Sequence, residues 1–305
     1  MFKKSKKVIP NIDTKFENLY MALYSNHLVE IEKLRKITMW LFVSTFLFIL
    51  LLILVPIAIV KIFSVILFLL SLFLGFFYKR KYVHAYKNDV IKKFIQLFNN
   101  KLEYSATTDD FFIQRNYINA NFTNEDFTNF YADDYIKGYL DSSTFIRMAD
   151  IKVQRIVRSG KSSYTVTLFS GIFAFTTSIK NINAQIKISK NNFNILTNSG
   201  SVEMDNSIFE KYFDVYSENE LLTMRILTHD VMNTLVDFYI KYNLPFEIVL
   251  SNNIIYLRFF TGKMFEPKIF GKSLDKDLLF THYNILNFVM TVSNNINKVL
   301  QEIEI

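Results

Sequence analysis

Adjacent carboxylates and histidines are the residues of this chain whose chemistry could support a reaction. Asp109–Asp110 and Asp133–Asp134 are paired carboxylates, the residue type used in general acid–base catalysis. His229–Asp230 pairs an imidazole with a carboxylate, but metal ligands on a helix usually lie four residues apart rather than one. A helix start explains Asp109–Asp110 and Asp230, and a solvated turn explains Asp133–Asp134. We favour these structural roles.

Motifs for nucleophilic catalysis and for phosphate binding are incomplete. Ser170–Gly171 and Gly200–Ser201 are the nearest fragments of a G-x-S-x-G nucleophile elbow. The seven glycines are dispersed and form no phosphate-binding loop. His27 and His84 have no acidic or histidine partner at ligand spacing. We therefore expect no catalytic residues, no metal and no cofactor, and leave open whether the protein is an enzyme.

Basic residues surround a predicted turn at Ser159–Gly160. They are Lys152, Arg155, Arg158 and Lys161. Close to a membrane, such a turn can contact anionic headgroups, with about 1 kcal/mol for each basic residue. A solvated hairpin tip is the simpler interpretation, and we favour it.

The C-terminal helix carries a regular seam of β-branched residues. They recur at 4-3-4-3-4 spacing, at Ile285, Val289, Val292, Ile296, Val299 and Ile303. This spacing is typical of a helix that packs along another helix. We place packing within the chain first and a homo-oligomer contact second, and the seam is the best candidate for a partner contact.

Residues 37–78 are almost entirely apolar, interrupted by Pro56 and Lys61. Because about 20 helical residues cross a bilayer core, this run predicts two transmembrane spans, Ile37–Val55 and Ile62–Tyr78, joined by a turn at Pro56–Lys61. Basic residues flank the run on both sides, whereas Lys61 alone lies between the spans. The positive-inside rule then places both termini in the cytoplasm.

The composition predicts the partners and the source of the protein. The net charge of +7 comes largely from the residues that flank the spans, so it indicates an anionic leaflet rather than nucleic acid. Abundant lysine, asparagine, isoleucine and phenylalanine are typical of an AT-rich bacterial genome. We expect a multi-pass protein of the bacterial inner membrane.

The chain is predicted to have four regions. Residues 1–36 form a basic amphipathic helix that begins near Asn11, 37–78 the transmembrane hairpin, 79–104 a juxtamembrane helix and 105–305 a soluble α+β domain. The fold class is thus α+β, with a mostly antiparallel sheet, flanking helices and a long C-terminal helix.

The elements of the soluble domain follow from the hydrophobic period. Short helices are expected near Asp109–Arg115 and Asn124–Tyr131, and longer ones at Glu218–Leu227, from Thr228 to Leu244, and at Lys276–Glu302. A period of two predicts strands at Tyr135–Leu140, Thr144–Ala149, Ile151–Val157, Tyr164–Phe175 and Gln185–Ser189. Phe246–Leu250 and Ile254–Phe260 are predicted to form a hairpin through Asn252–Asn253.

Several runs of sequence resemble those of one known family. They are DYIKGYLD from Asp134, TFIRMADIKV from Thr144, FSGIFAF from Phe169 and MDNSIFEKYFDVY from Met204. They resemble a bacterial family of membrane-anchored proteins catalogued as a domain of unknown function, some of whose members are encoded near LemA-like proteins. The resemblance covers about residues 15–265. It implies two N-terminal transmembrane helices before a soluble domain, and no activity or functional residues.

Two classes of function are compatible with these observations. We favour a non-enzymatic, membrane-anchored adaptor whose cytoplasmic domain binds a protein partner or the leaflet surface. The alternative is an enzyme, or a sensor of a small ligand, at the same face of the membrane. A pocket with converging carboxylates or histidines would favour the alternative.

Overall fold

The computed structural model describes residues 14–23, 27–123, 125–140, 144–160, 162–191, 201–272 and 274–303. The chain divides into two compact units, which we describe separately. The helical unit comprises Met1–Phe98 and Glu266–Tyr283, and the sheet unit comprises Asn99–Phe265 and Asn284–Ile305. The segment after Phe265 therefore joins the N-terminal helices, although it lies within the region predicted to be one soluble domain.

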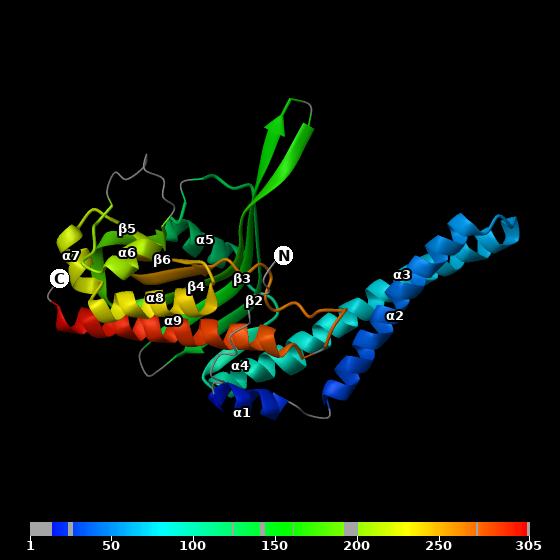
Figure 1. Ribbon diagram of the computed structural model, residues 1–305, viewed down its shortest axis with the longest axis horizontal. Helices are drawn as coiled ribbons and strands as arrows, with labels where there is room; N and C mark the ends of the chain where they lie inside the picture. Colours follow the sequence, from blue (N-terminus) through cyan, green and yellow to red (C-terminus); the bar gives the residue numbers. More distant parts are fainter. Residues whose placement is uncertain are drawn as a thin grey trace, which may run out of the picture. The chain divides into compact units, whose positions relative to one another are not determined.

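The helical unit is built on two long helices, α2 (His27–Leu54) and α3 (Ala58–Ala85). They lie side by side as a hairpin (Figure 1), and both are long and apolar enough to cross a membrane. Pro56 lies in the break between them because proline cannot continue a helix. The break is shorter than predicted, since Lys61 already lies in the first turn of α3.

Small residues bring α2 and α3 close together. The Thr45 and Ser71 hydroxyl oxygens lie 2.9 Å apart across the two helices. A side chain at Gly75 would meet the ring of Phe42 at 3.4 Å, and this ring packs edge-on against Phe76. Small residues and hydroxyl pairs of this kind are typical of helices that pack in membranes.

Two shorter segments complete the N-terminal part of the helical unit. The amphipathic helix predicted from Asn11 to Lys36 is shorter: α1 spans Thr14–Leu23, and α2 begins at His27. Residues 1–13 lie outside the described residues. At the other end, α3 continues through a π-helical turn, Tyr86–Ile91, into α4 (Lys92–Phe98). The helical part of the predicted juxtamembrane region, residues 79–104, thus ends at Phe98, and its last residues belong to a strand.

The sheet unit contains a six-stranded antiparallel sheet with the order β1-β2-β3-β4-β5, in which β6 also pairs with β4. The strands are β1 (Leu102–Ser105), β2 (Asn129–Tyr139), β3 (Phe145–Ser159), β4 (Ser162–Lys190), β5 (Phe213–Ser217) and β6 (Phe246–Phe259). This confirms the predicted α+β class and its mostly antiparallel sheet.

Helices cover both faces of this sheet. The helices of the unit are α5 (Asp110–Ala120), α6 (Ser207–Tyr212), α7 (Glu220–Ile226), α8 (His229–Tyr242) and residues 284–302 of α9 (Lys276–Glu302). On one face, Tyr117 of α5 packs with Phe173 and Tyr256 of the sheet. On the other, Phe238 of α8 stacks on Phe288 of α9 with ring centroids 3.8 Å apart, and α8 and α9 lie side by side (Figure 1).

Several predicted elements were wrong because strand pairing decided them. Asn129–Tyr131, expected in a helix, begin β2. Thr144–Ala149 and Ile151–Val157 were predicted as two strands and form the single strand β3. Tyr164–Phe175 and Gln185–Ser189 were also predicted as two strands and form the single strand β4. The predicted hairpin is absent: β6 is continuous, and Asn252, with φ of 54°, lies at a register shift against β4. Asparagine tolerates positive φ in a bulge as well as in a hairpin turn, so its presence does not distinguish the two.

Candidate functional site

A groove of about 1230 Å³ lies along the first turns of α2 in the helical unit. Its lining residues come from α1, α2 and the segment before α9: Tyr20, Leu28, Val29, Glu32, Lys33, Arg35, Lys36, Ile37, Trp40, Leu41, Ser44, Gly271, Lys272 and Leu274. Aliphatic and aromatic residues form most of this surface, and exposed lysines interrupt it. The groove therefore combines an apolar wall with positive charge.

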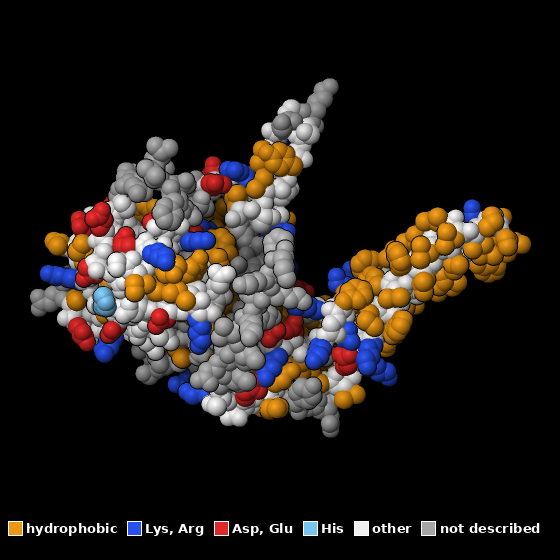
Figure 2. All heavy atoms as spheres, viewed as in Figure 1, with side chains coloured by type: hydrophobic (Ala, Val, Ile, Leu, Met, Phe, Trp, Pro, Cys, Tyr) orange, Lys and Arg blue, Asp and Glu red, His pale blue; other side chains and the backbone are white. Residues whose placement is uncertain are grey.

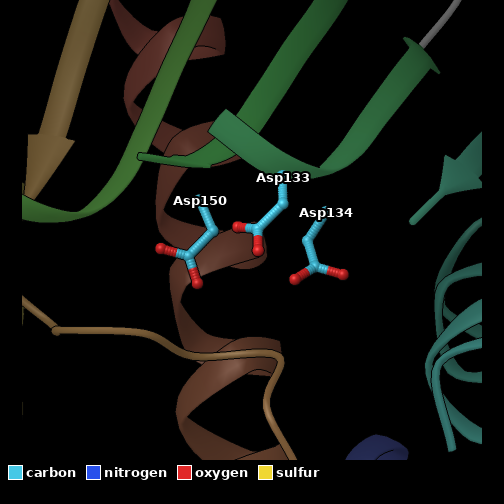
Figure 3. Close-up of side chains that lie close together, drawn as sticks. All are labelled: Asp133, Asp134 and Asp150. Atoms are coloured by element: carbon cyan, nitrogen blue, oxygen red, sulfur yellow. The ribbon is translucent and has the colours of Figure 1, made fainter. Parts of the chain in front are cut away.

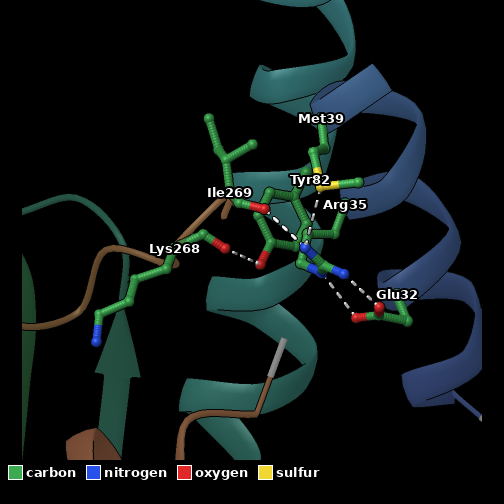
Figure 4. Close-up of polar contacts among 6 residues, drawn as sticks. All are labelled: Glu32, Arg35, Met39, Tyr82, Lys268 and Ile269. Carbon is green, nitrogen blue, oxygen red and sulfur yellow. Dashed lines mark hydrogen bonds and ion pairs between the residues drawn. The ribbon is translucent and has the colours of Figure 1, made fainter. Parts of the chain in front are cut away.

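One wall of the groove belongs to a strap, residues 266–272 and 274–275, that is bonded to both long helices (Figure 4). The buried Arg35 guanidinium of α2 donates to the Ile269 carbonyl at 2.7 Å and to both carboxylate oxygens of Glu32 at 2.9 and 2.6 Å. The Tyr82 hydroxyl of α3 donates to the Lys268 carbonyl at 3.1 Å. Because these bonds use backbone carbonyls of the strap, they fix its path without using its side chains.

The polar side chains of the groove are mostly basic. Among its described lining residues the only carboxylate is Glu32, which pairs with Arg35. No histidine or cysteine is among these described lining residues.

Three carboxylates converge in the sheet unit, on the side chains of Asp133, Asp134 and Asp150 (Figure 3). Asp133 of β2 lies directly opposite Asp150 of β3 in the strand register. The register shifts after Asp133, and Asp134 in this bulge has φ of 53°, in the left-handed region. One oxygen from each carboxylate lies within 4.8 Å of the others. The prediction of a solvated turn here was wrong, because Asp134 is buried within a strand.

Each carboxylate of this aspartate cluster has a donor. The Tyr104 hydroxyl donates to Asp134, the Met264 amide donates to Asp150 at 2.8 Å, and the Lys263 ammonium lies 3.2 Å from Asp133.

Burial raises the pKa of Asp150 to about 7. The Met264 amide opposes this rise, the charges of Asp133 and Asp134 add to it, and Lys263 opposes it. The aspartate cluster can therefore hold a proton near neutral pH. Its oxygens are also of the type that binds Mg²⁺ or Ca²⁺.

The pair β3 and β4 continues past the end of β2 as a two-stranded arm, which projects from the sheet (Figure 1). Of the basic residues predicted to surround a turn, Arg155 and Arg158 lie on this arm, whereas Lys152 is paired with Tyr131 of β2 in the body of the sheet. Lys152, Arg155 and Arg158 all belong to β3, and Lys161 lies outside the described residues. Arg155 forms an ion pair with Glu125 at 3.4 Å. Positions 155 and 158 are three apart on a strand, so they face opposite sides of the arm. The lipid contact of this turn stays a prediction.

The predicted seam of the last helix lies inside the sheet unit. Ile285, Val289, Val292 and Ile296 are buried, and Val299 is half-buried. The chain itself covers these side chains, and a contact of the seam with a partner or a second copy stays a prediction.

The remaining candidates for chemistry have structural positions. Asp109 caps α5 by accepting from the amides of Phe111 and Phe112 at 3.1 and 3.2 Å, as a helix start required. His229 and Asp230 are exposed at the start of α8.

Comparison with known proteins finds that part of the chain matches a family model. Residues 167–298 match DUF3137. The description of this family is "Protein of unknown function", which confirms the resemblance to a domain of unknown function. No curated protein matches the chain. Among solved structures, the mycobacterial trehalose monomycolate transport factor A, TtfA, is similar with 9% identity and a TM-score of 0.39, over 68% of this chain and 93% of that chain.

The DUF3137 segment contains β5, β6, most of β4 and the seam as far as Ile296, whereas Asp133, Asp134 and Asp150 precede it. The sequence analysis missed Asp150 as a partner of the other two aspartates. The available signal was its position between Ala149 and Ile151, where a carboxylate interrupts an apolar strand. The groove was also missed, and it has no local signal because the strap follows α2 by more than 200 residues in the sequence.

Proposed function

We propose that this protein is a non-enzymatic adaptor, anchored in the bacterial inner membrane by α2 and α3, that presents its sheet unit to a partner in the cytoplasm. The observation that carries the proposal is the outer surface of the helix pair. Ile53, Ile62 and Phe73 are 72%, 62% and 70% exposed, while the Thr45–Ser71 pair lies between the helices. Apolar surface in water costs about 25 cal/mol per Å². Lipid around the pair removes this cost.

The charge at each end of the helix pair supports the orientation. Lys33, Arg35 and Lys36 precede the apolar run, and Lys79, Arg80 and Lys81 follow it. Lys61 lies at the opposite end of the pair, in the first turn of α3. With the positive end inside, residues 1–36 and 79–305 are cytoplasmic.

Exposed apolar side chains on the sheet unit support a role in protein binding. Ile208 of α6, Leu221 of α7 and Ile240 of α8 are 58%, 75% and 55% exposed. Figure 2 shows apolar side chains gathered over α6 and α8 on the visible face. A surface of this kind can bind a protein partner or a second copy of the chain. Crosslinking and pull-down from native membranes would test it, and the absence of any specific partner would contradict the adaptor role.

The orientation can be tested with single cysteines, because the chain contains none. In intact cells, Lys61→Cys is expected to react with a membrane-impermeant maleimide and Ser201→Cys to remain unlabelled. Ser201 is exposed, so Ser201→Cys should react after lysis, which controls for access. Labelling of Ser201→Cys but not Lys61→Cys in intact cells would reverse the orientation.

The alternative is an enzyme or small-ligand sensor at the same face of the membrane, and the convergence of Asp133, Asp134 and Asp150 favours it. Paired carboxylates, one of them with a raised pKa, are a frequent arrangement in acid–base sites. If Asp150→Asn abolished the cellular phenotype while abundance and folding were unchanged, this alternative would replace the adaptor.

A further inference from the structure

We propose that the groove along α2 binds one anionic phospholipid from the cytoplasmic leaflet. The inference rests on the proposed membrane anchor and adds a ligand class and a site. The phosphate would lie beside Lys33, Lys36 and Lys272, with an acyl chain along Ile37, Leu41 and Ser44.

Charge complementarity is the first argument. The groove is lined by four basic residues and one acidic residue, and the acidic one, Glu32, is held by Arg35. Lys33, Lys36 and Lys272 are exposed, and within the described part of the chain no ion pair involves them. Ammonium groups beside an apolar wall suit a ligand with a negatively charged head and a hydrocarbon tail.

The length of the groove is the second argument. From Lys33 to Ser44, α2 advances 11 residues, or about 16 Å at 1.5 Å per residue. Half of a bilayer core of roughly 30 Å is about 15 Å. The part from Ile37 to Ser44, about 10 Å, lies inside the apolar run, so the groove extends from the level of the headgroups through about two thirds of the depth of one leaflet. Trp40, 64% exposed on this face, belongs to the residue type that is enriched at the interface.

The position of the groove favours a lipid over a soluble partner. Its lower lining, Leu41 and Ser44, lies inside the apolar run, so a ligand that fills the whole groove must be in the bilayer. Its volume of about 1230 Å³ also exceeds the upper end, about 1,000 Å³, of pockets for drug-sized ligands. A phospholipid meets both conditions.

Trp40 is the only tryptophan of the chain, so its fluorescence reports on the groove directly. The full-length protein would be placed in phosphatidylcholine nanodiscs that contain a minor fraction of brominated phosphatidylglycerol or of brominated phosphatidylcholine. Bromine quenches tryptophan on contact, so the ratio of quenching gives the relative affinity of the two lipids. We expect a preference of at least about fivefold for phosphatidylglycerol, the effect of one basic contact.

Substitution of the three lysines tests the assignment of the site. The triple variant Lys33→Gln, Lys36→Gln and Lys272→Gln should lose the preference for phosphatidylglycerol, so that the two brominated lipids quench about equally. The matched control, Lys79→Gln, Arg80→Gln and Lys81→Gln, removes the same charge at the same end of the helix pair but outside the groove, and should keep the preference. An equal loss in both variants would indicate general surface attraction and overturn the proposal.

The other outcomes separate this proposal from the anchor itself. Equal quenching by both lipids in the unmodified protein would leave the anchor intact and overturn the lipid site. Protein that co-elutes with nanodiscs but is quenched by neither lipid would indicate a groove filled by a protein segment or a second copy, which also overturns it. Protein that fails to enter nanodiscs would overturn the anchor.

Discussion

Replacing Asp150 by asparagine tests the electrostatics of the aspartate cluster. An asparagine can keep the hydrogen bond from the Met264 amide, because its carbonyl oxygen accepts as the carboxylate does. It removes the charge that is buried opposite Asp133 and beside Asp134. We expect Asp150→Asn to raise the free energy of unfolding of the sheet unit, more at pH 8 than at pH 5.

The sign follows from the two pKa values of Asp150, about 7 in the fold and 3.8 in the unfolded chain. Below the lower value both states are protonated, and the carboxyl has no effect. As the pH rises toward 7 the unfolded chain loses the proton first, so stability falls. Above pH 7 the ionised carboxylate lowers the free energy of unfolding by its full amount, about 4 kcal/mol at 1.36 kcal/mol for each unit of difference between the two pKa values. Removing the carboxyl should therefore stabilise the protein by about 2–3 kcal/mol more at pH 8 than at pH 5.

Thermal unfolding of the full-length protein in detergent, followed by circular dichroism, can measure this difference. At roughly 2–4 °C per kcal/mol, Asp150→Asn should raise the melting temperature by roughly 5–10 °C more at pH 8 than at pH 5. Asp126→Asn removes an exposed carboxylate of the same unit and should change neither value. If Asp150→Asn lowered the melting temperature equally at both pH values, Asp150 would be ionised and well paired in the fold, and the reasoning would be refuted.

Two further predictions concern packing in the sheet unit, and both can be measured by the same unfolding assay. Val292→Asn places an amide in the buried seam and should lower the free energy of unfolding by about 1–3 kcal/mol for the unpaired polar group alone. Asn294→Ala, on the exposed flank, should change it very little. Unchanged stability of Val292→Asn would exclude the seam from the core. Gly171→Ala should be strongly destabilising, because its Cβ would collide with the Phe259 carbonyl oxygen of β6, whereas Gly262→Ala meets open space and bears only the cost of its positive φ, about 1–2 kcal/mol. Equal costs at the two glycines would contradict the close approach of β4 and β6.

The fold could be predicted where one local signal decided the element. The last helix has the predicted bounds, Lys276–Glu302, because its apolar period is regular over its whole length. The continuity of β4 could not be predicted in this way. Its polar middle around Asn181–Asn183 resembles a loop, and it remains a strand because β6 pairs with β4 on both sides of this segment. Strand propensity depends on such distant neighbours.

The candidate sites were less predictable than the fold because each depends on contacts between distant segments. Asp133 and Asp134 are adjacent in the sequence, but Asp150 reaches them only through the register of β2 and β3, and a one-residue slip would turn it to the other face. The lysines of α2 were recognised as topology signals. Their role in a groove depends on the strap, whose attachment through the Ile269 carbonyl no sequence pattern records.

The aspartate cluster and the groove differ in whether a ligand can reach them, and this bears on the choice between adaptor and enzyme. Asp134 and Asp150 are 0% and 2% exposed, so a substrate could contact the cluster only through the half-buried Asp133 unless the surrounding strands opened. A catalytic acid must touch its substrate, whereas a buried cluster that only holds a proton affects stability alone. If Asp150→Asn stabilised the protein at pH 8 and left its cellular function intact, the cluster would lower the stability of the fold without contributing to function. The exposed groove would then be the better candidate for function.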